Sequence, residues 1–333
     1  MERQELLRTL LTAHGPSGDE GAVRDAIQKL VTPLADEVTV DVMGNLIAHR
    51  RGNGPKVLLA AHMDTVGVIV THIEDSGFLR FGSLGGLEAK ALYQTAVRFC
   101  NGVGGVISVD EEKAEQEFKL TDLYLDIGAA DGAEARTMVS VGDTAVFCGP
   151  ILENGTRVIA PYLDNRAGCA ALIQVLEGLR HTPNDLFFVF TAQEEVGLRG
   201  AKPAAWALEP DYALIVDVTC PDDVPGATHD GTTAVGKGAA IKVMDHAVIC
   251  HPAMVERLSA LARKGNIPAQ RDLLRTGGTD GGPVHVSREG VLTGGVSIPC
   301  RYTHTPTELM DWKDFDACVR LIQAFCEEEL EQL

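Results

Sequence analysis

Apolar residues near the start of the chain recur at the three- and four-residue spacing of amphipathic helices. One such helix is predicted over residues 1–18 and a second over residues 20–31. The next apolar stretches are shorter and predict strands over residues 37–42 and 45–50, on either side of Gly44. The N-terminal segment lacks the uninterrupted apolar run of a secretory signal peptide, so we expect it to belong to the folded protein.

A nearly continuous apolar run over residues 56–61 predicts a central strand, because strands covered on both faces lose the apolar–polar alternation. After Asp164 the pattern alternates between strand and helix. The predicted elements are a helix over 166–180, strands over 186–191 and 212–218, a helix over 254–264, a strand around 296–298 and a closing helix from Trp312. This alternation is typical of an α/β fold.

The segment between the two α/β parts has a different pattern. Short β-rich runs separated by glycine occur at residues 77–81, 96–99 and 102–108, and helical periodicity is scarce. We therefore predict a discontinuous, hydrolase-like α/β domain with a mixed sheet, formed by residues 1–69 and 161–333. A β-rich domain is inserted over residues 70–160. No long polar linker separates the two, so the insertion is expected to pack against the α/β domain.

Charge and cysteine content narrow the classes of partner. The formal net charge is −18, and neither nucleic acid nor an anionic membrane surface is an expected partner without a basic stripe. No run approaches the roughly 18–20 apolar residues of a membrane span. The eight cysteines include no CxxC pair, which favours free thiols in a reducing cytoplasm.

His62 and Asp64 follow the predicted central strand at its carboxyl end, where open α/β sheets place their ligand sites. Residues two apart in a strand point to the same side, so Asp64 can support the His62 ring and fix its tautomer. A His-x-Asp sequence is common, however, and taken alone it is more often a hydrogen-bonded turn than a metal site.

Asp164 and the Glu194–Glu195 pair are the acidic candidates. Asp164 precedes a predicted helix, where an aspartate is ordinarily an N-cap, but the same position can hold a carboxylate whose two oxygens bind different ions. Glu194 and Glu195 follow the strand over 186–191, and adjacent carboxylates repel unless solvent or cations compensate them. One of the two can bind a metal while the other acts as a base toward water.

Asp217 and His304 lie at two further junctions between a predicted strand and a loop, where each alone would more commonly be structural. With His62, Asp164 and Glu195 they supply enough ligands for two metal ions roughly 3.5–4 Å apart, bridged by one carboxylate. Mixed imidazole and carboxylate ligation is typical of zinc, cobalt or manganese.

Five motifs in this order resemble the M42 family of metallo-aminopeptidases, which includes glutamyl and tetrahedral aminopeptidases. They are AHMDTVG at 61–67, LDNR at 163–166, TAQEEVGLRG at 191–200, VD at 216–217 and CRYTH at 300–304. The resemblance covers nearly the whole chain. It implies that His62 and Asp217 hold one ion, that Glu195 and His304 hold the other, that Asp164 bridges, that Glu194 is the general base and that Asp64 orients His62.

The same resemblance implies hydrolysis of the N-terminal peptide bond of peptides, by a water between the two metals that Glu194 activates. It also implies a six- or eight-stranded mixed sheet and an inserted barrel-like domain that mediates dimerisation or covers the site, often within a dodecamer. The segment TGGTDGG at 276–282 is similar to the family's substrate-pocket loop, although it could be only a flexible turn. Asn165 and Gly281 depart from the common family pattern, and neither is a proposed ligand.

Two other classes of function remain open at this point. A deacetylase, a carboxypeptidase or an endoglucanase could share the scaffold. A carboxypeptidase would need a cationic clamp such as Arg275 or Arg301, and a glycosidase would need two carboxylates and no metal. A non-catalytic, metal-stabilised protein is the other class, and the presence of Glu194 and of all five ligands disfavours it.

Overall fold

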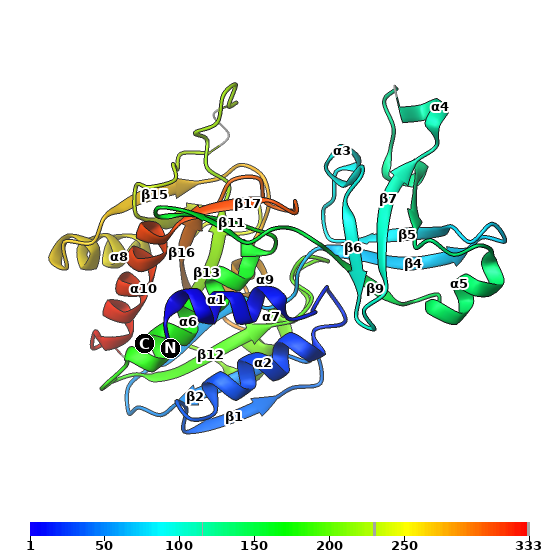
Figure 1. Cartoon of the computed structure of the whole chain (residues 1–333). Helices are drawn as coiled ribbons and strands as arrows, with labels where there is room; N and C mark the ends of the chain where they lie inside the picture. The colour runs from blue at the N-terminus through cyan, green and yellow to red at the C-terminus, as the bar shows by residue number, and fades with distance from the viewer. Residues whose placement is uncertain (115, 229–230, 332–333) are drawn as a thin grey trace.

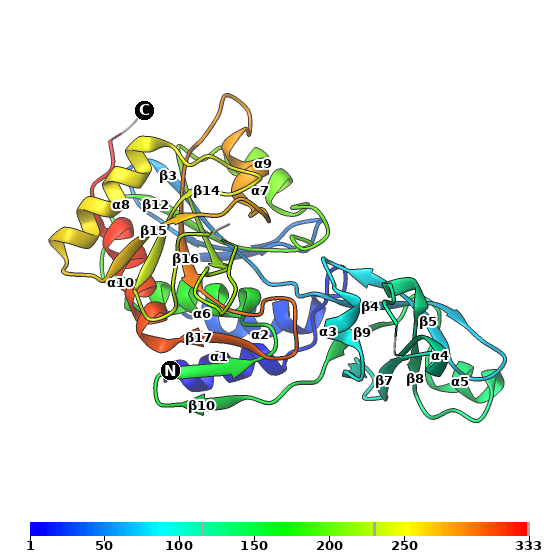
Figure 2. The same ribbon diagram turned by 90° about the horizontal axis from the view of Figure 1, so that it is seen from above.

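The computed structural model describes residues 1–114, 116–228 and 231–331. It consists of an α/β body and a closed β-barrel that projects from one side of the body (Figure 1; Figure 2). The predicted fold class, a mixed-sheet α/β domain with an inserted barrel, is confirmed. Both described ends of the chain lie on the body, away from the barrel (Figure 1).

An eight-stranded mixed sheet forms the centre of the body. Its strand order is β1 (Glu37–Val40), β2 (Leu46–Arg50), β12 (Asp185–Thr191), β3 (Lys56–His62), β13 (Tyr212–Thr219), β16 (Leu292–Pro299), β14 (Ala239–Met244) and β15 (Ala269–Leu273). The four strands from β12 to β16 in this order are mutually parallel. Their carboxyl ends therefore meet at one edge of the sheet.

The residues of β3 alternate between two apolar layers, as the pleat of a strand requires. Val57, Leu59 and Ala61 belong to the larger core, and Leu58 and Ala60 belong to a smaller core on the opposite face. The larger core lies under α1 (Arg3–Thr12), α2 (Gly21–Val31), α6 (Leu163–Gly178) and α10 (Trp312–Glu327), with α8 (Pro252–Lys264) beside α10. The smaller core lies under α7 (Ala201–Leu208) and α9 (Gly281–His285). The predicted central strand is confirmed as buried on both faces.

The barrel is closed by six antiparallel strands. Their order is β4 (Gly67–Ile73), β5 (Leu79–Leu84), β8 (Leu123–Asp126), β7 (Gly104–Val109), β6 (Ala96–Phe99) and β9 (Thr144–Phe147). The connections contain α3 (Ala89–Leu92), α4 (Glu111–Ala114), the 3₁₀ turn Leu120–Asp122 and α5 (Gly132–Met138). The chain then returns to the body through a small sheet of β10 (Leu152–Asn154), β11 (Arg157–Ala160) and β17 (Glu308–Asp311).

The N-terminal helix is shorter than the sequence pattern predicts. Helix α1 ends at Thr12, not near residue 18, because Pro16 has no amide hydrogen for the carbonyl of Thr12 and its ring would clash with that carbonyl in a helix. The chain beyond it pairs with the body instead: Pro16 forms a parallel bridge with Thr65. The buried Arg166 side chain donates hydrogen bonds to the carbonyls of Leu10, Ala13 and Gly15, which fixes this turn near the end of β3.

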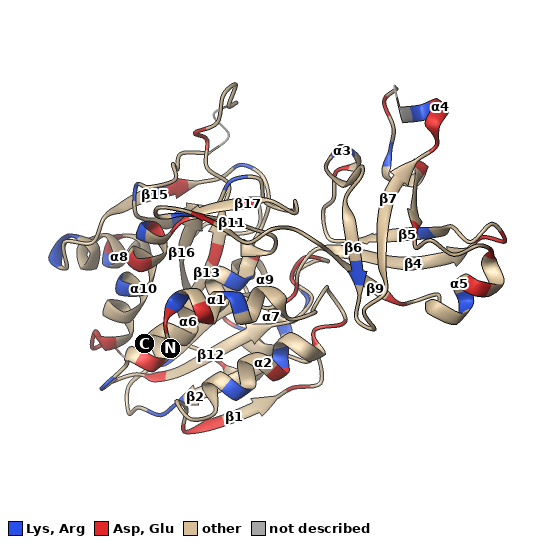
Figure 3. Cartoon of the chain, in the orientation of Figure 1, with Lys and Arg blue, Asp and Glu red and all other residues tan. Residues whose placement is uncertain are grey.

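Acidic and basic residues are interspersed over both the body and the barrel (Figure 3). All eight cysteines are free thiols, and Cys169, Cys250, Cys300, Cys318 and Cys326 are buried. Within the described parts of the chain, no helix combines the length and the apolar character needed to cross a bilayer.

Candidate metal centre

The five predicted ligands converge at the edge where the parallel strands end. His62 is the last residue of β3 and pairs with Thr191, the last residue of β12, so the Glu194–Glu195 turn begins beside it. Asp217 lies near the end of the next strand, β13. The structure brings all five residues together with Glu194, since Asp164 enters from the start of α6 and His304 from the loop after β16.

Asp164 lies between the two imidazoles. Its Oδ1 is 3.1 Å from His62 Nε2, and its Oδ2 is 3.5 Å from His304 Nε2. The side chain does not cap α6, because the backbone at Asp164 leaves the helical conformation and the N-cap position belongs to Tyr162. Each carboxylate oxygen therefore faces a different histidine.

The remaining carboxylates divide between the two histidines. Asp217 Oδ1 lies 3.5 Å and Glu194 Oε2 lies 3.9 Å from His62 Nε2. Glu195 Oε2 lies 3.1 Å from His304 Nε2. All of these side chains are nearly buried except that of His304, which is 34% exposed toward the cavity side.

Backbone carbonyls fix the orientation of both imidazoles. His304 Nδ1 is 2.7 Å from the carbonyl oxygen of Gly86, and His62 Nδ1 is 3.1 Å from that of Asp64. A carbonyl can only accept, so Nδ1 of each ring is a donor, and Nε2 is the ring atom that faces the carboxylates and could bind a metal ion. Gly86 belongs to the connection after β5, so the barrel contributes directly to the orientation of His304.

Asp64 organises more of the site than the sequence predicts. Its carboxylate lies 3.6 Å from His62 Nδ1, in line with the orienting role proposed for it. The same carboxylate accepts hydrogen bonds from the backbone amides of Glu194 and Glu195, at 3.0 and 3.2 Å, and from the Ser17 hydroxyl at 2.6 Å. Asp64 thus connects the end of β3 to the turn that carries both glutamates.

Burial and charge act in opposite directions on the acidic groups. Burial holds the pKa of Glu194 well above its usual value, and the neighbouring Asp217 charge raises it further. Burial also acts to raise the pKa of Asp164, but hydrogen bonds to His304 and His62 outweigh it and hold that pKa below the usual range. The carboxylates Asp164 and Glu195 in turn raise the pKa of His304 to about 12, against the effect of burial.

The donor set fits divalent metal ions. His62, Asp164 and Glu195 offer ligand atoms within 4.8 Å of one another, and so do His62, Glu194 and Asp217. Glu195 Oε1 is buried and has no hydrogen-bond partner among the described residues, which is costly unless a cation compensates it. Imidazole and carboxylate ligands at this spacing suit zinc, cobalt or manganese better than calcium.

Comparison with known proteins identifies the family. The model of the M42 glutamyl aminopeptidases matches residues 44–321. The chain belongs to the M42 family. A protein of Acetivibrio thermocellus, assigned only by inference as an aminopeptidase, is 43% identical over 324 residues, which cover 97% of this chain and 98% of the relative.

Solved structures agree with this assignment. An aminopeptidase from the archaeon Desulfurococcus kamchatkensis superposes with a TM-score of 0.94 at 38% identity, over 98% of this chain and 95% of that one. The TET1 peptidase of Pyrococcus horikoshii, described as assembling into a tetrahedron or a large octahedral shell, gives 0.90 at 32% identity, over 98% and 100%. Membership in the M42 metallopeptidases makes the chain an aminopeptidase and implies divalent metal ions at this site.

A cavity of about 470 Å³ opens at the site formed by the five predicted ligands and Glu194, which we call the M42 site. Gly277, Gly278 and Thr279 of the glycine-rich loop line it, as the family resemblance implies. Asp280 of the same loop is not among the lining residues, and its Oδ2 accepts a 2.5 Å hydrogen bond from the Thr191 hydroxyl at the end of β12. The loop is therefore tied to the strand that precedes the glutamate pair.

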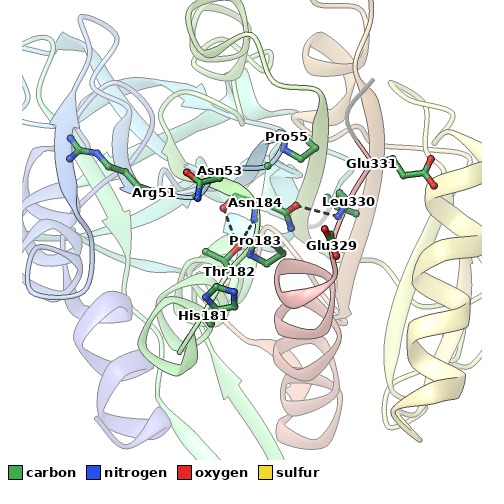
Figure 4. A pocket seen from close by; sticks show the side chains of 12 residues that line it. Arg51, Asn53, Pro55, His181, Thr182, Pro183, Asn184, Glu329, Leu330 and Glu331 are labelled. Atoms are coloured by element: carbon green, nitrogen blue, oxygen red, sulfur yellow. Dashed lines mark hydrogen bonds between the residues drawn. The ribbon is translucent and has the colours of Figure 1, made fainter.

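A larger cavity of about 980 Å³ lies at the opposite edge of the sheet, where β3 and β12 begin (Figure 4). Two of its polar side chains, Thr182 and Asn184, are engaged by backbone groups. The buried Asn184 donates to the carbonyls of Cys326 and Glu328 and accepts from the amide of Leu330, so it holds the end of α10. The lining residues drawn in Figure 4 include no group of His, Cys, Asp or Glu side chains close enough together to hold a metal ion.

Ser17, Gly86 and Glu308 contribute to the M42 site and were not predicted from the sequence. Ser17 and Gly86 act through single hydrogen bonds across long sequence separations. Glu308, discussed below, follows His304 by four residues, and that proximity was the only available signal.

Proposed function

We propose that this chain removes the N-terminal residue of peptides with two divalent metal ions, zinc or cobalt, with manganese as an alternative. His62 and Asp217 would hold one ion and Glu195 and His304 the other. The observation that carries the proposal is the position of Asp164, whose two oxygens face the two histidines at 3.1 and 3.5 Å. One carboxylate so placed can bridge two ions.

The chain's own residues supply proton transfer and positioning. When bound, the ions would polarise the scissile carbonyl and make water more acidic. Glu194 would accept a proton from the attacking water and pass it to the departing amine, since its carboxylate lies beside the ligands and its pKa is held well above the usual value by burial. Asp64 holds the backbone of Glu194 at a fixed distance from His62.

Removal of the C-terminal residue, as by a carboxypeptidase, is less well supported. A carboxypeptidase needs a cation for the terminal carboxylate. One of the two arginines considered for that role, Arg301, is engaged by Asp223 through two hydrogen bonds of 2.6 and 2.7 Å. Peptides blocked at either end separate the two activities: N-acetylation is expected to abolish cleavage and C-terminal amidation to leave it intact, whereas the reverse result would contradict the proposal.

The cavity favours an uncharged N-terminal side chain. Leu198, Ala247 and Leu274 form apolar parts of its wall. Apart from the proposed metal ligands and Glu194, the Lys and Asp side chains that line the cavity already have partners: Lys242 Nζ lies 2.6 Å from Asp272, and Asp245 accepts from two backbone amides and from the Thr279 hydroxyl. A charged substrate side chain would lose its hydration without gaining a partner.

We therefore expect kcat/KM for leucyl-nitroanilide to exceed the values for the lysyl and glutamyl compounds by at least about tenfold. Ala247→Asp should reduce this preference by improving the lysyl substrate, since it places an unpaired carboxylate on the wall. Steady-state kinetics on the three compounds provides the test. Equal or better hydrolysis of a charged substrate by the wild type would refute the proposed pocket specificity.

We also propose that the chain forms a homo-oligomer built from dimers, as large as a dodecamer, and that the barrel contributes contacts. The assembly described for the similar TET1 peptidase supports this proposal. Val106 and Val141 expose 45% and 62% of their surface on the barrel, although isolated exposed valines are also normal on monomers.

Sedimentation velocity tests the assembly. The wild type should sediment as a multiple of the 35.5 kDa chain. Changing both Val106 and Val141 to Glu is expected to yield smaller species, because charges resist burial in an interface. Val42→Glu is the control, on a fully exposed valine of the body. A monomeric wild type, or a double variant that keeps the wild-type size, would count against the barrel interface.

The proposed compartment is the cytoplasm. All eight cysteines are free thiols, and three of them, Cys100, Cys148 and Cys220, are exposed. Exposed unpaired thiols are compatible with a reducing environment.

A further inference from the structure

Glu308 is a buried carboxylate that contacts the backbone of two proposed ligands at once. Its Oε2 accepts a hydrogen bond of 2.8 Å from the amide of Asp164, and its Oε1 accepts one of 2.8 Å from the amide of His304. The residue is 1% exposed. These two contacts connect segments that lie 140 residues apart, the Asp164 turn and the His304 loop, through a single side chain.

The position of Glu308 is set by the small sheet at the base of the site. Glu308 is the first residue of β17 and pairs with Ala160, the last residue of β11. Ala160 precedes Asp164 by four residues, and Glu308 follows His304 by four. The register of β11 with β17 therefore brings the two ligand-bearing turns to either side of one carboxylate.

Both turns adopt a backbone conformation that needs support. Tyr162, Tyr302 and His304 have φ values of 63°, 61° and 63°, in the left-handed region that non-glycine residues rarely occupy. Residues in this conformation are strained and persist where surrounding contacts enforce them. Each oxygen of Glu308 accepts a hydrogen bond from one of the two turns, and this pair of contacts can supply the restraint.

We propose that Glu308 is a positioning residue that sets the distance between Asp164 and His304, and thereby the metal affinity of the site formed by Glu195 and His304. This inference rests on the two-metal site proposed above. Glu308 is not itself placed as a ligand, because it belongs to neither group of side chains whose ligand atoms lie within 4.8 Å of one another. The other ligands, His62 and Asp217, depend on the ends of central strands and have no contact with Glu308 among those described.

The Glu308→Gln variant tests this role with the smallest change in side-chain shape. Glutamine has the same length, but its amide nitrogen cannot accept, so one of the two backbone amides would face a donor. Loss of comparable supporting contacts around metal ligands weakens binding by roughly 10–100-fold. We expect a weakening of about that size at the Glu195–His304 site. The weakening at the His62–Asp217 site should be smaller, because Glu308 reaches that site only through the bridging Asp164.

Asp314→Asn is the matched control. Asp314 is fully buried and likewise accepts two backbone amides, from Gly236 at 2.5 Å and Gly238 at 2.6 Å, but these belong to neither ligand turn. This variant should lose thermal stability without a change in metal affinity. If Glu308→Gln does not fold, Glu308→Asp offers the same comparison, because the shorter side chain keeps the carboxyl group but cannot reach both amides.

The experiment is calorimetric titration of the metal-free full-length protein with Co²⁺ or Zn²⁺, followed by activity at increasing metal concentration. Weaker metal binding by Glu308→Gln, with one of the two binding events affected more than the other and turnover restored by excess metal, would support the positioning role. Equal affinities in Glu308→Gln and wild type would overturn it, whatever the number of ions bound. A wild type that binds a single ion would contradict the two-metal proposal, yet weaker binding of that ion by Glu308→Gln would still support Glu308.

Discussion

The Glu194→Gln variant is expected to keep about two metal ions per chain while its turnover falls by roughly 10²–10⁴-fold. Glutamine preserves the size and the hydrogen-bonding reach of the side chain but cannot accept a proton from water. The carboxylate of Glu194 approaches His62 Nε2 less closely than those of Asp164 and Asp217, at 3.9 Å against 3.1 and 3.5 Å. Metal content measured by mass spectrometry, together with kcat, gives the comparison.

The neighbouring Glu195→Gln variant serves as the control. Glu195 lies 3.1 Å from His304 Nε2, and its Oε1 is buried without a partner, so its loss should weaken metal binding itself. The backbone amides of Glu194 and Glu195 both donate hydrogen bonds to the Asp64 carboxylate. A general disturbance of the turn would therefore affect both variants alike. Loss of metal in Glu194→Gln with retention in Glu195→Gln would require the two roles to be exchanged.

Asp164→Ala is expected to reduce the affinity for both ions together and to abolish measurable turnover. A bridging carboxylate serves both sites, and each site needs about four ligands including water. Removal of Asp164 would also leave His62 and His304 without the carboxylate that both imidazoles face. Calorimetric titration should show two weakened binding events.

Asp217→Ala distinguishes a bridge from a terminal ligand. Asp217 lies 3.5 Å from His62 Nε2, and its contacts among the described residues do not include His304. Its loss should therefore weaken one binding event and leave the other near its wild-type affinity. If Asp164→Ala also lost only one event, Asp164 would be a ligand of a single ion and not a bridge.

The central part of the fold follows from local pattern. The apolar run over 56–61 predicts a strand covered on both faces, and β3 is buried from Val57 to His62. The helical spacing of Val23 and Ile27 predicts α2, and both residues are buried on that helix. These elements could be predicted because burial of one or two faces leaves a periodic signature in the sequence.

Elements stabilised by distant contacts left no such signature. Strand β17 has four residues and becomes a strand only by pairing with β11, nearly 150 residues away. The edge strand β15 exposes most of its residues, so its hydrophobic pattern is weak. The predicted first helix was too long, because the interaction of Pro16 with Thr65 could not be inferred from residues 1–18 alone.

The candidate site shows the same division. His62, Glu195 and Asp217 could be proposed because each lies at or near the end of a recognisable strand, and parallel strand ends converge. Glu308 and Gly86 could not be proposed from the sequence. A glutamate at the start of a short strand looks like any other glutamate, and a backbone carbonyl is present in every residue. Gly86 acts through one hydrogen bond with His304, and Glu308 acts through two, with His304 and Asp164; only the three-dimensional structure determines these contacts.

The most direct test of the two-metal aminopeptidase is a single titration in which bound metal and hydrolysis of leucyl-nitroanilide are measured on the same samples. Metal-free full-length protein would receive increasing Zn²⁺ or Co²⁺, and each sample would be analysed after removal of free ion. We expect activity to rise with the second ion bound per chain and to reach its maximum near two. Full activity at one bound ion per chain, with no further increase at two, would contradict the account.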